Sequence, residues 1–118
     1  MAKLVDIHIH LTDDAYRDIL NYLKTYLKAT DAVLVCVSVD LKSSMECVEW
    51  AEEFRGKVLP FLGVHPQMAG EANIDRFLEY LMKMSDVAVG VGETGLDRRL
   101  GSKQDVGEGQ RKVFREQL

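Results

Sequence analysis

The sequence predicts an α/β protein built on a parallel sheet, and two observations lead to this fold class. Four short apolar segments recur along the 118 residues, and each is followed by a segment with the periodicity of an amphipathic helix. A repeated strand–helix order implies right-handed crossovers, which place consecutive strands parallel in one sheet. A chain of this length is expected to form one domain and can bury a core.

The four predicted strands are short and apolar. The second is almost continuously apolar and β-branched, which is typical of parallel strands that are covered on both faces of the sheet. The four segments occupy residues 4–7, 32–39, 58–64 and 87–91.

Apolar stripes and capping residues predict two helices between the first three strands. In the first helix, apolar side chains recur at every fourth position over residues 15–27. Thr12 is its expected N-cap, followed by acidic residues in the first turn. In the second helix, Ser43 and Glu46 have the spacing of a capping box. That helix is therefore expected to begin at Ser43 and to end at Gly56.

Two further helices follow the third and fourth strands. One has an amphipathic stripe over residues 74–82, after Asn73, and the other begins near Gln110 and runs to Leu118. Parallel α/β proteins bind ligands at the carboxyl ends of their strands. This edge of the sheet is therefore where a functional site is expected.

The composition argues against several classes of protein. A formal net charge of -4 disfavours a nucleic-acid coat or a membrane-surface protein, which carry basic patches. It leaves a nuclease open, because metal ions can supply positive charge at the scissile phosphate. No apolar stretch approaches the roughly 20 residues of a membrane span. No secretory signal precedes the first strand, so a cytoplasmic location is the default expectation.

The two cysteines are expected to be reduced and buried. Cys36 lies in the apolar second strand and Cys47 in the helical pattern after it. A free cysteine behaves as a small apolar side chain. The spacing does not indicate a disulfide framework.

Histidines stand at the predicted carboxyl ends of two strands. The first strand continues to His10, and alternate residues of a strand face the same side. Asp6, His8 and His10 are therefore expected to share one face, and His65 ends the third strand. Imidazole is a common ligand for zinc and similar cations. The alternative for His8 and His10 is two ordinary histidines, one structural and one exposed.

Two carboxylates follow the fourth strand. Glu93 comes directly after the apolar segment, between Gly92 and Gly95. A carboxylate at this position can bridge two cations, as two-metal hydrolytic sites require. A capping or solvated glutamate is the alternative. Asp97 is expected either to orient a histidine or to cap a turn.

At these residues the sequence resembles the TatD-like metal-dependent deoxyribonucleases of the amidohydrolase superfamily. Four motifs occur in the family's order and extend over the whole chain, which makes the resemblance specific. They are Asp6-Ile7-His8-Ile9-His10-Leu11, Gly63-Val64-His65-Pro66, Gly92-Glu93-Thr94-Gly95-Leu96-Asp97 and the closing segment 110–118.

The resemblance implies a TIM-type (β/α)8 barrel with a divalent-metal centre that hydrolyses phosphodiester bonds in DNA. His8 and His10 would hold one cation, and Glu93 would bridge it to a second. His65 would lie near the substrate phosphate, so Glu93 and His65 are the expected catalytic residues. Two ions are expected in the complete fold, with zinc, magnesium and manganese as candidates.

Four more residues are expected close to this centre. They would support the ligands or contact the substrate, and they are Asp6, Asp97, Arg98 and Arg99. The two arginines and Lys103 belong to the loop after the fourth strand and could bind substrate phosphates. A solvated loop is the alternative for this basic cluster.

The length predicts only part of a barrel. A complete barrel takes about 250 residues, so residues 1–118 are expected to form a single half-barrel domain of four βα units. They would be a fragment or a truncated relative. The family's later ligands, two histidines and an aspartate, have no counterpart here. The chain alone is therefore expected to have little or no hydrolase activity.

Two further expectations follow from a half-barrel. The alternative function is a non-catalytic assembly unit that keeps a vestigial metal site. The unpaired edges of the first and fourth strands and the open inner face predict a homo-oligomer that closes the half-barrel.

Overall fold

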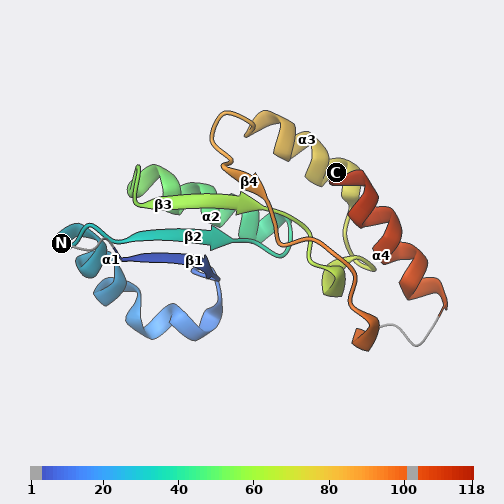
Figure 1. Ribbon diagram of the computed structural model, residues 1–118, viewed down its shortest axis with the longest axis horizontal. Coiled ribbons are helices and arrows are strands. Elements are labelled where there is room, and N and C mark those ends of the chain that lie inside the picture. The colour runs from blue at the N-terminus through green and yellow to red at the C-terminus, as the bar shows by residue number, and fades with distance from the viewer. Residues whose placement is uncertain (1–3, 101–103) are drawn as a thin grey trace.

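The computed structural model describes residues 4–100 and 104–118, and it shows one parallel sheet (Figure 1). The strand order is β1-β2-β3-β4, and all neighbouring strands run parallel. The predicted parallel α/β class is therefore confirmed. The strands are β1 Val5–Ile9, β2 Val33–Val37, β3 Val58–Leu62 and β4 Gly90–Val91.

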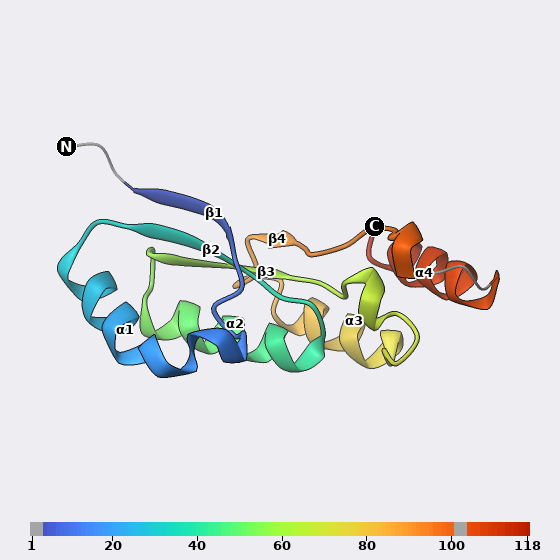
Figure 2. The same cartoon turned by 90° about the horizontal axis from the view of Figure 1, so that it is seen from below.

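Helices connect the strands and lie on one side of the sheet. Figure 2 shows α1, α2 and α3 packed below the strands, whereas α4 lies beyond the carboxyl ends of the strands. The α-helices are α1 Leu20–Ala29, α2 Leu41–Glu53, α3 Ile74–Lys83 and α4 Gln104–Glu116. The described residues also form the 3-10 helices η1 Asp14–Ile19, η2 Pro66–Met68 and η3 Arg98–Leu100.

The start of the first helical segment differs from the prediction. Asp13, not Thr12, is the N-cap, and its carboxylate accepts a hydrogen bond from Ala15 N–H at 2.8 Å. The chain also turns tightly here, because Asp13 N–H donates to the carbonyl of His10 at 3.0 Å. This turn makes Asp13 the residue that faces the first free amides, and the segment opens as 3-10 helix η1.

The second helix begins earlier than predicted. Asp40 is its N-cap, so Ser43 is the third helical residue and not the cap. The Asp40 carboxylate accepts from Ser43 N–H at 2.7 Å, and the Ser43 hydroxyl accepts from Asp40 N–H at 3.1 Å. The capping box is therefore Asp40-x-x-Ser43, three residues before the predicted one. The pairs Asp40/Ser43 and Ser43/Glu46 both have the three-residue spacing of a capping box, and the structure uses the first pair.

The last two elements also differ in length from their predictions. The strand predicted over 87–91 is reduced to β4, because the amides of Val87 and Ala88 donate to Met84 in the turn after α3. Helix α4 begins at Gln104, six residues before the predicted start. Gly107 and Gly109 lower the helical propensity of that first part and conceal it in the sequence.

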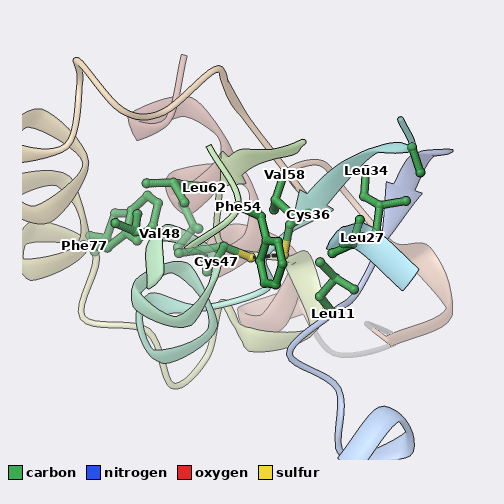
Figure 3. Close-up of a cluster of buried hydrophobic side chains, with 14 of the residues drawn as sticks. Leu11, Leu27, Leu34, Cys36, Cys47, Val48, Phe54, Val58, Leu62 and Phe77 are labelled. Carbon is green, nitrogen blue, oxygen red and sulfur yellow. Dashed lines mark hydrogen bonds between the residues drawn. The ribbon is translucent and has the colours of Figure 1, made fainter. Parts of the chain in front are cut away.

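The core lies between the sheet and helices α1 to α3 (Figure 3). Leu27, Leu62 and Phe77 are almost fully buried in it. Cys36 and Cys47 are free and buried, with their sulfur atoms 2.6 Å apart. The hydrogen bond to Cys36, together with burial, raises the pKa of the Cys47 thiol far above its ordinary value. This thiol therefore stays protonated and acts as an apolar core group.

The two outer strands of the sheet carry exposed apolar side chains. Ile7 on β1 is 76% exposed, and Val5, beside it, is 52% exposed. Val89 and Val91, at β4, are 54% and 44% exposed. The second strand, β2, for which cover on both faces was predicted, is largely buried. Within the described residues, strands β1 and β4 have only one neighbouring strand each and remain partly exposed.

The carboxyl ends of β2, β3 and β4 are joined through Ser38, which is fully buried. Its hydroxyl accepts from Gly63 N–H at 2.8 Å and donates to the Gly63 carbonyl at 3.2 Å. Its own carbonyl accepts from Glu93 N–H at 2.9 Å. A Cβ atom on Gly63 would lie 2.4 Å from the carbonyl carbon of Gly92. Only glycine allows this close approach of two strand ends.

We expect Gly63→Ala to lower the free energy of unfolding by about 1–3 kcal/mol or more, because the new methyl group meets backbone that cannot rotate away. Gly70→Ala is the matched control, since a Cβ there meets nothing within 4 Å. Urea denaturation of both variants measures the difference. Equal midpoints for Gly63→Ala and Gly70→Ala would contradict the close approach.

Candidate metal centre

Two histidines at the end of β1 point their rings toward one another. His8 Nε2 and His10 Nε2 are 3.2 Å apart, and the ring planes are inclined at 75°. The pairing of β1 with β2 shifts register between Asp6 and Ile9, which marks an irregularity in the strand. The Asp6 carboxylate accepts from His8 N–H at 3.0 Å within this segment. The two rings thus meet at the carboxyl end of the sheet.

Glu93 brings a carboxylate to the same point from the end of β4. Its Oε2 atom lies 3.4 Å from both His8 Nε2 and His10 Nε2. The Gly92–Glu93 peptide bond is cis. The ligand atoms of His8, His10 and Glu93 all lie within 4.8 Å of one another, and these residues form a group that could hold a metal ion.

Hydrogen bonding fixes the tautomer of His10. Its Nδ1 atom lies 3.0 Å from the carbonyl of Val37, which can only accept. Nδ1 therefore carries the proton of the neutral ring, and Nε2 presents a lone pair toward His8 and Glu93. His8 Nε2 either donates to His10 Nε2 or, with its proton on Nδ1, presents a second lone pair. In the second state, two nitrogens and one carboxylate oxygen face the same point, a donor set that fits a divalent cation.

His65 has the opposite arrangement of donor and acceptor. Its Nδ1 atom accepts from Gln67 N–H at 3.0 Å, so the neutral ring carries its proton on Nε2. That Nε2 atom lies 3.4 Å from Glu93 Oε1, the oxygen that does not face His8 and His10. Glu93 thus has lone-pair donors on one side and an N–H group on the other.

An open cleft of about 600 Å³ contains all four of these side chains. Its other walls come from η1, the N-terminal turns of α2, and the segment around η2. Lys42 is the basic residue among the described lining residues, which also include several acids and hydroxyl groups. The lining residues outside the four are Thr12, Asp13, Asp14, Val39, Asp40, Lys42, Ser43, Glu46, Gln67 and Met68.

The remaining predicted site residues lie outside this group. Asp6 bonds to the backbone of His8 and is exposed. Asp97 Oδ1 accepts from the Arg99 backbone at 2.9 Å, which corresponds to the turn-capping alternative. Arg99 also donates to both carboxylate oxygens of Asp97, and these bonds lower the pKa of the Asp97 carboxyl. Arg98 is exposed in η3, and Lys103 lies outside the described residues.

Sequence reasoning missed three residues that build this edge of the sheet. Ser38 joins three strand ends. Gln110 on α4 and Gln117, directly after α4, bond to the loops that follow β4 and β3. A polar residue directly after an almost fully apolar strand is a signal for Ser38. The recurrence of glutamine after seven residues on one helix face is a signal for Gln110 and Gln117.

Residues 5–118 match the family described as TatD related DNase. The chain is 32% identical to the mouse protein named putative deoxyribonuclease TATDN3 and 31% identical to the human deoxyribonuclease TATDN3. Each alignment covers 98% of this chain but only 43% or 46% of the relative. The chain therefore spans less than half the length of the curated relatives that it matches.

Solved structures show the same fold. The structure of YJJV, a TatD homologue from Escherichia coli, superposes with a TM-score of 0.76 at 20% identity, over 97% of this chain and 44% of that one. An uncharacterized amidohydrolase from Saccharomyces cerevisiae gives a TM-score of 0.74 at 21% identity, over 99% of this chain and 43% of that chain. The four βα units thus correspond to part of the TIM-type barrel of these proteins. The family match extends over nearly the whole sequence, and the chain belongs to the family of TatD related DNases.

Proposed function

We propose that this chain supplies the first half of a metal-dependent hydrolase that cleaves phosphodiester bonds in DNA. The observation that carries the proposal is the convergence of His8, His10 and Glu93 in an open cleft. The names of the mouse and human relatives describe deoxyribonucleases, which supports DNA as the substrate. Family membership supports hydrolysis as the reaction.

In this proposal His8, His10 and Glu93 hold a divalent cation. When bound, such an ion neutralises phosphate charge and lowers the pKa of a bound water. Glu93 has a second oxygen, Oε1, which is turned away from the two imidazoles. That oxygen supports the idea that Glu93 bridges to a second cation in the complete fold. Zinc, manganese and magnesium are the candidates, and the mixed nitrogen and oxygen ligands favour the first two.

His65 has a different proposed role, as a hydrogen-bond donor to substrate. Its Nδ1 atom is occupied by Gln67 N–H, which leaves the Nε2–H group facing the cleft. A donor near the cation suits a non-bridging phosphate oxygen. Lys42, on the rim of the same cleft, is the described lining residue that can add positive charge for a flanking phosphate. Arg99 is less suited, since its guanidinium is held by Asp97.

We expect Glu93→Gln to weaken Mn²⁺ binding by about tenfold or more, because it removes the only negative charge of the three ligands. Glu79→Gln is the matched control, since Glu79 is an exposed glutamate on α3. Titration calorimetry and Mn²⁺ electron paramagnetic resonance measure both variants. Equal affinity in the two would refute the metal centre, and very weak binding by the unaltered chain would favour the vestigial assembly unit.

We expect the chain alone to show little or no nuclease activity. With His8, His10 and Glu93 on one cation, only the bridging Glu93 would be left to hold a second cation among the described residues. Incubation with labelled single-stranded DNA and Mn²⁺ measures the turnover. Rapid cleavage that disappears in His8→Ala would overturn this expectation, because it would show that the described ligands suffice.

The exposed outer strands of the sheet support a proposal about assembly. We propose that these two edges, with exposed Ile7 on β1 and Val91 on β4, pack against further βα units, either from a longer chain or from a second copy. The relatives have more than twice the matched length, which supports such units.

No helix within residues 4–100 and 104–118 is long and apolar enough to cross a membrane. A cytoplasmic location remains part of this proposal.

We expect the 118-residue chain to self-associate at micromolar concentration, because exposed apolar side chains on a sheet with two free edges attract a partner. Multi-angle light scattering measures the mass. Ile7→Asp should reduce the association, whereas Met82→Asp should not. Met82 is a matched control, since it is 77% exposed on α3 and Ile7 is 76% exposed on β1. A monodisperse monomer would contradict the expectation.

A further inference from the structure

Helix α4 and the turn directly after it carry two buried glutamines, Gln110 in the helix and Gln117 just beyond its last residue. Gln110 is 4% exposed, Gln117 is 6% exposed, and Val113 between them is 5% exposed. These residues are spaced i, i+3 and i+7, which places them on the same side of the helix. Seven residues correspond to roughly 10 Å along the helix axis. The face therefore presents two side-chain amides, two turns apart, on either side of an apolar contact.

Gln117 pairs with the backbone of Val64. Its Oε1 atom accepts from Val64 N–H at 2.7 Å, and its Nε2 atom donates to the Val64 carbonyl at 3.2 Å. Nε2 also donates to the carbonyl of Val113 at 3.1 Å, so both of its hydrogens are used. The amide thereby takes the place of a neighbouring strand for the residue that immediately precedes His65.

Gln110 makes the same two-point contact with the loop after β4. Its Oε1 atom accepts from Asp97 N–H at 2.9 Å, and its Nε2 atom donates to the Asp97 carbonyl at 3.2 Å. Asp97 ends the segment that leaves the sheet at Glu93, and its carboxylate holds Arg99. Helix α4 and the turn after it therefore contact the loops after both β3 and β4.

The position of His65 depends on these backbone bonds. Its own N–H donates to the Val39 carbonyl at 2.8 Å, and the ring approaches Glu93 Oε1 at 3.4 Å. His65 follows Val64 directly, so even a small displacement of the Val64 backbone would turn the His65 Nε2–H group away from Glu93. Buried polar groups that lose their partners seek new ones, so an amide removed at Gln117 would release the Val64 backbone.

We propose that Gln117 and Gln110 are positioning residues that act as a glutamine clamp. Gln117 fixes Val64 and thereby sets the His65 ring against Glu93, whereas Gln110 fixes the far end of the loop that begins at Glu93. The value of the clamp for hydrolysis rests on the proposed function of His65 and Glu93. The clamp itself does not depend on a bound metal.

Nuclear magnetic resonance of the ¹⁵N-labelled, metal-free chain tests the clamp. Gln117→Met keeps the length of the side chain and removes all three of its hydrogen bonds, two to Val64 and one to the Val113 carbonyl. We expect the Val64 amide to exchange with solvent at least about tenfold faster, consistent with the loss of a buried hydrogen bond. We expect the His65 ring resonances to shift, while those of His8 and His10 remain in place.

Gln110→Met provides the complementary result. It should accelerate amide exchange at Asp97 and shift the Arg99 Nε resonance, with His65 unchanged. Lys112→Met is the control for the substitution itself, because Lys112 is exposed on the same helix. Val113→Ala is the control for lost stability, because it opens the core but leaves the amide bonds intact. A His65 shift in Val113→Ala equal to that in Gln117→Met would overturn the proposal.

Two further outcomes are decisive. An unchanged His65 ring in a folded Gln117→Met variant would overturn the proposal. If Gln117→Met does not fold, Gln117→Glu replaces it, since a carboxylate accepts from Val64 N–H but cannot donate to the carbonyl. Unchanged His65 ring resonances in Gln117→Glu would also overturn the proposal. Zinc titration of the unaltered chain distinguishes the metal centre from the glutamine clamp. If zinc leaves the ring resonances of His8 and His10 unchanged, the metal centre is refuted, whereas the clamp is not affected.

Discussion

The site depends on the contact between the Ser38 hydroxyl and the backbone of Gly63. This hydroxyl serves both polar groups of Gly63, and the Ser38 carbonyl holds the amide of Glu93. All of these groups are buried or half-buried, so each unpaired one would cost about 1–3 kcal/mol. Strand ends usually diverge into loops, but here three of them are held together. That is why a carboxylate on β4 can reach imidazoles on β1.

The sequence predicted the order of the elements because that information is local. Apolar strands alternate with amphipathic helices, and the crossover rule then dictates a parallel sheet. His8, His65 and Glu93 were also predicted at strand ends, and in a parallel sheet all carboxyl ends share an edge. The opposite roles of the ring nitrogens in His10 and His65 were not predicted: Nδ1 donates in His10 and accepts in His65. These roles depend on Val37 and Gln67, whose positions follow only from the folded chain.

The errors at element ends have a common cause. Thr12 and Ser43 were predicted as caps, whereas Asp13 and Asp40 cap the segments in the structure, because the choice depends on how the preceding strand leaves the sheet. Gln117 was overlooked because its partners lie in a loop 53 residues earlier, a distance that periodicity cannot bridge.

The placement of the helices on one face has a consequence for the order of folding. The buried cluster between sheet and helices is formed by side chains from Leu11 to Val113, all from this stretch of the chain. Crossovers between neighbouring strands also keep its contacts short in sequence. In a longer chain with further βα units, as proposed above, such a unit can complete its core on the ribosome before those units are synthesised. The free edge of β4 would then be the template on which the next strand pairs.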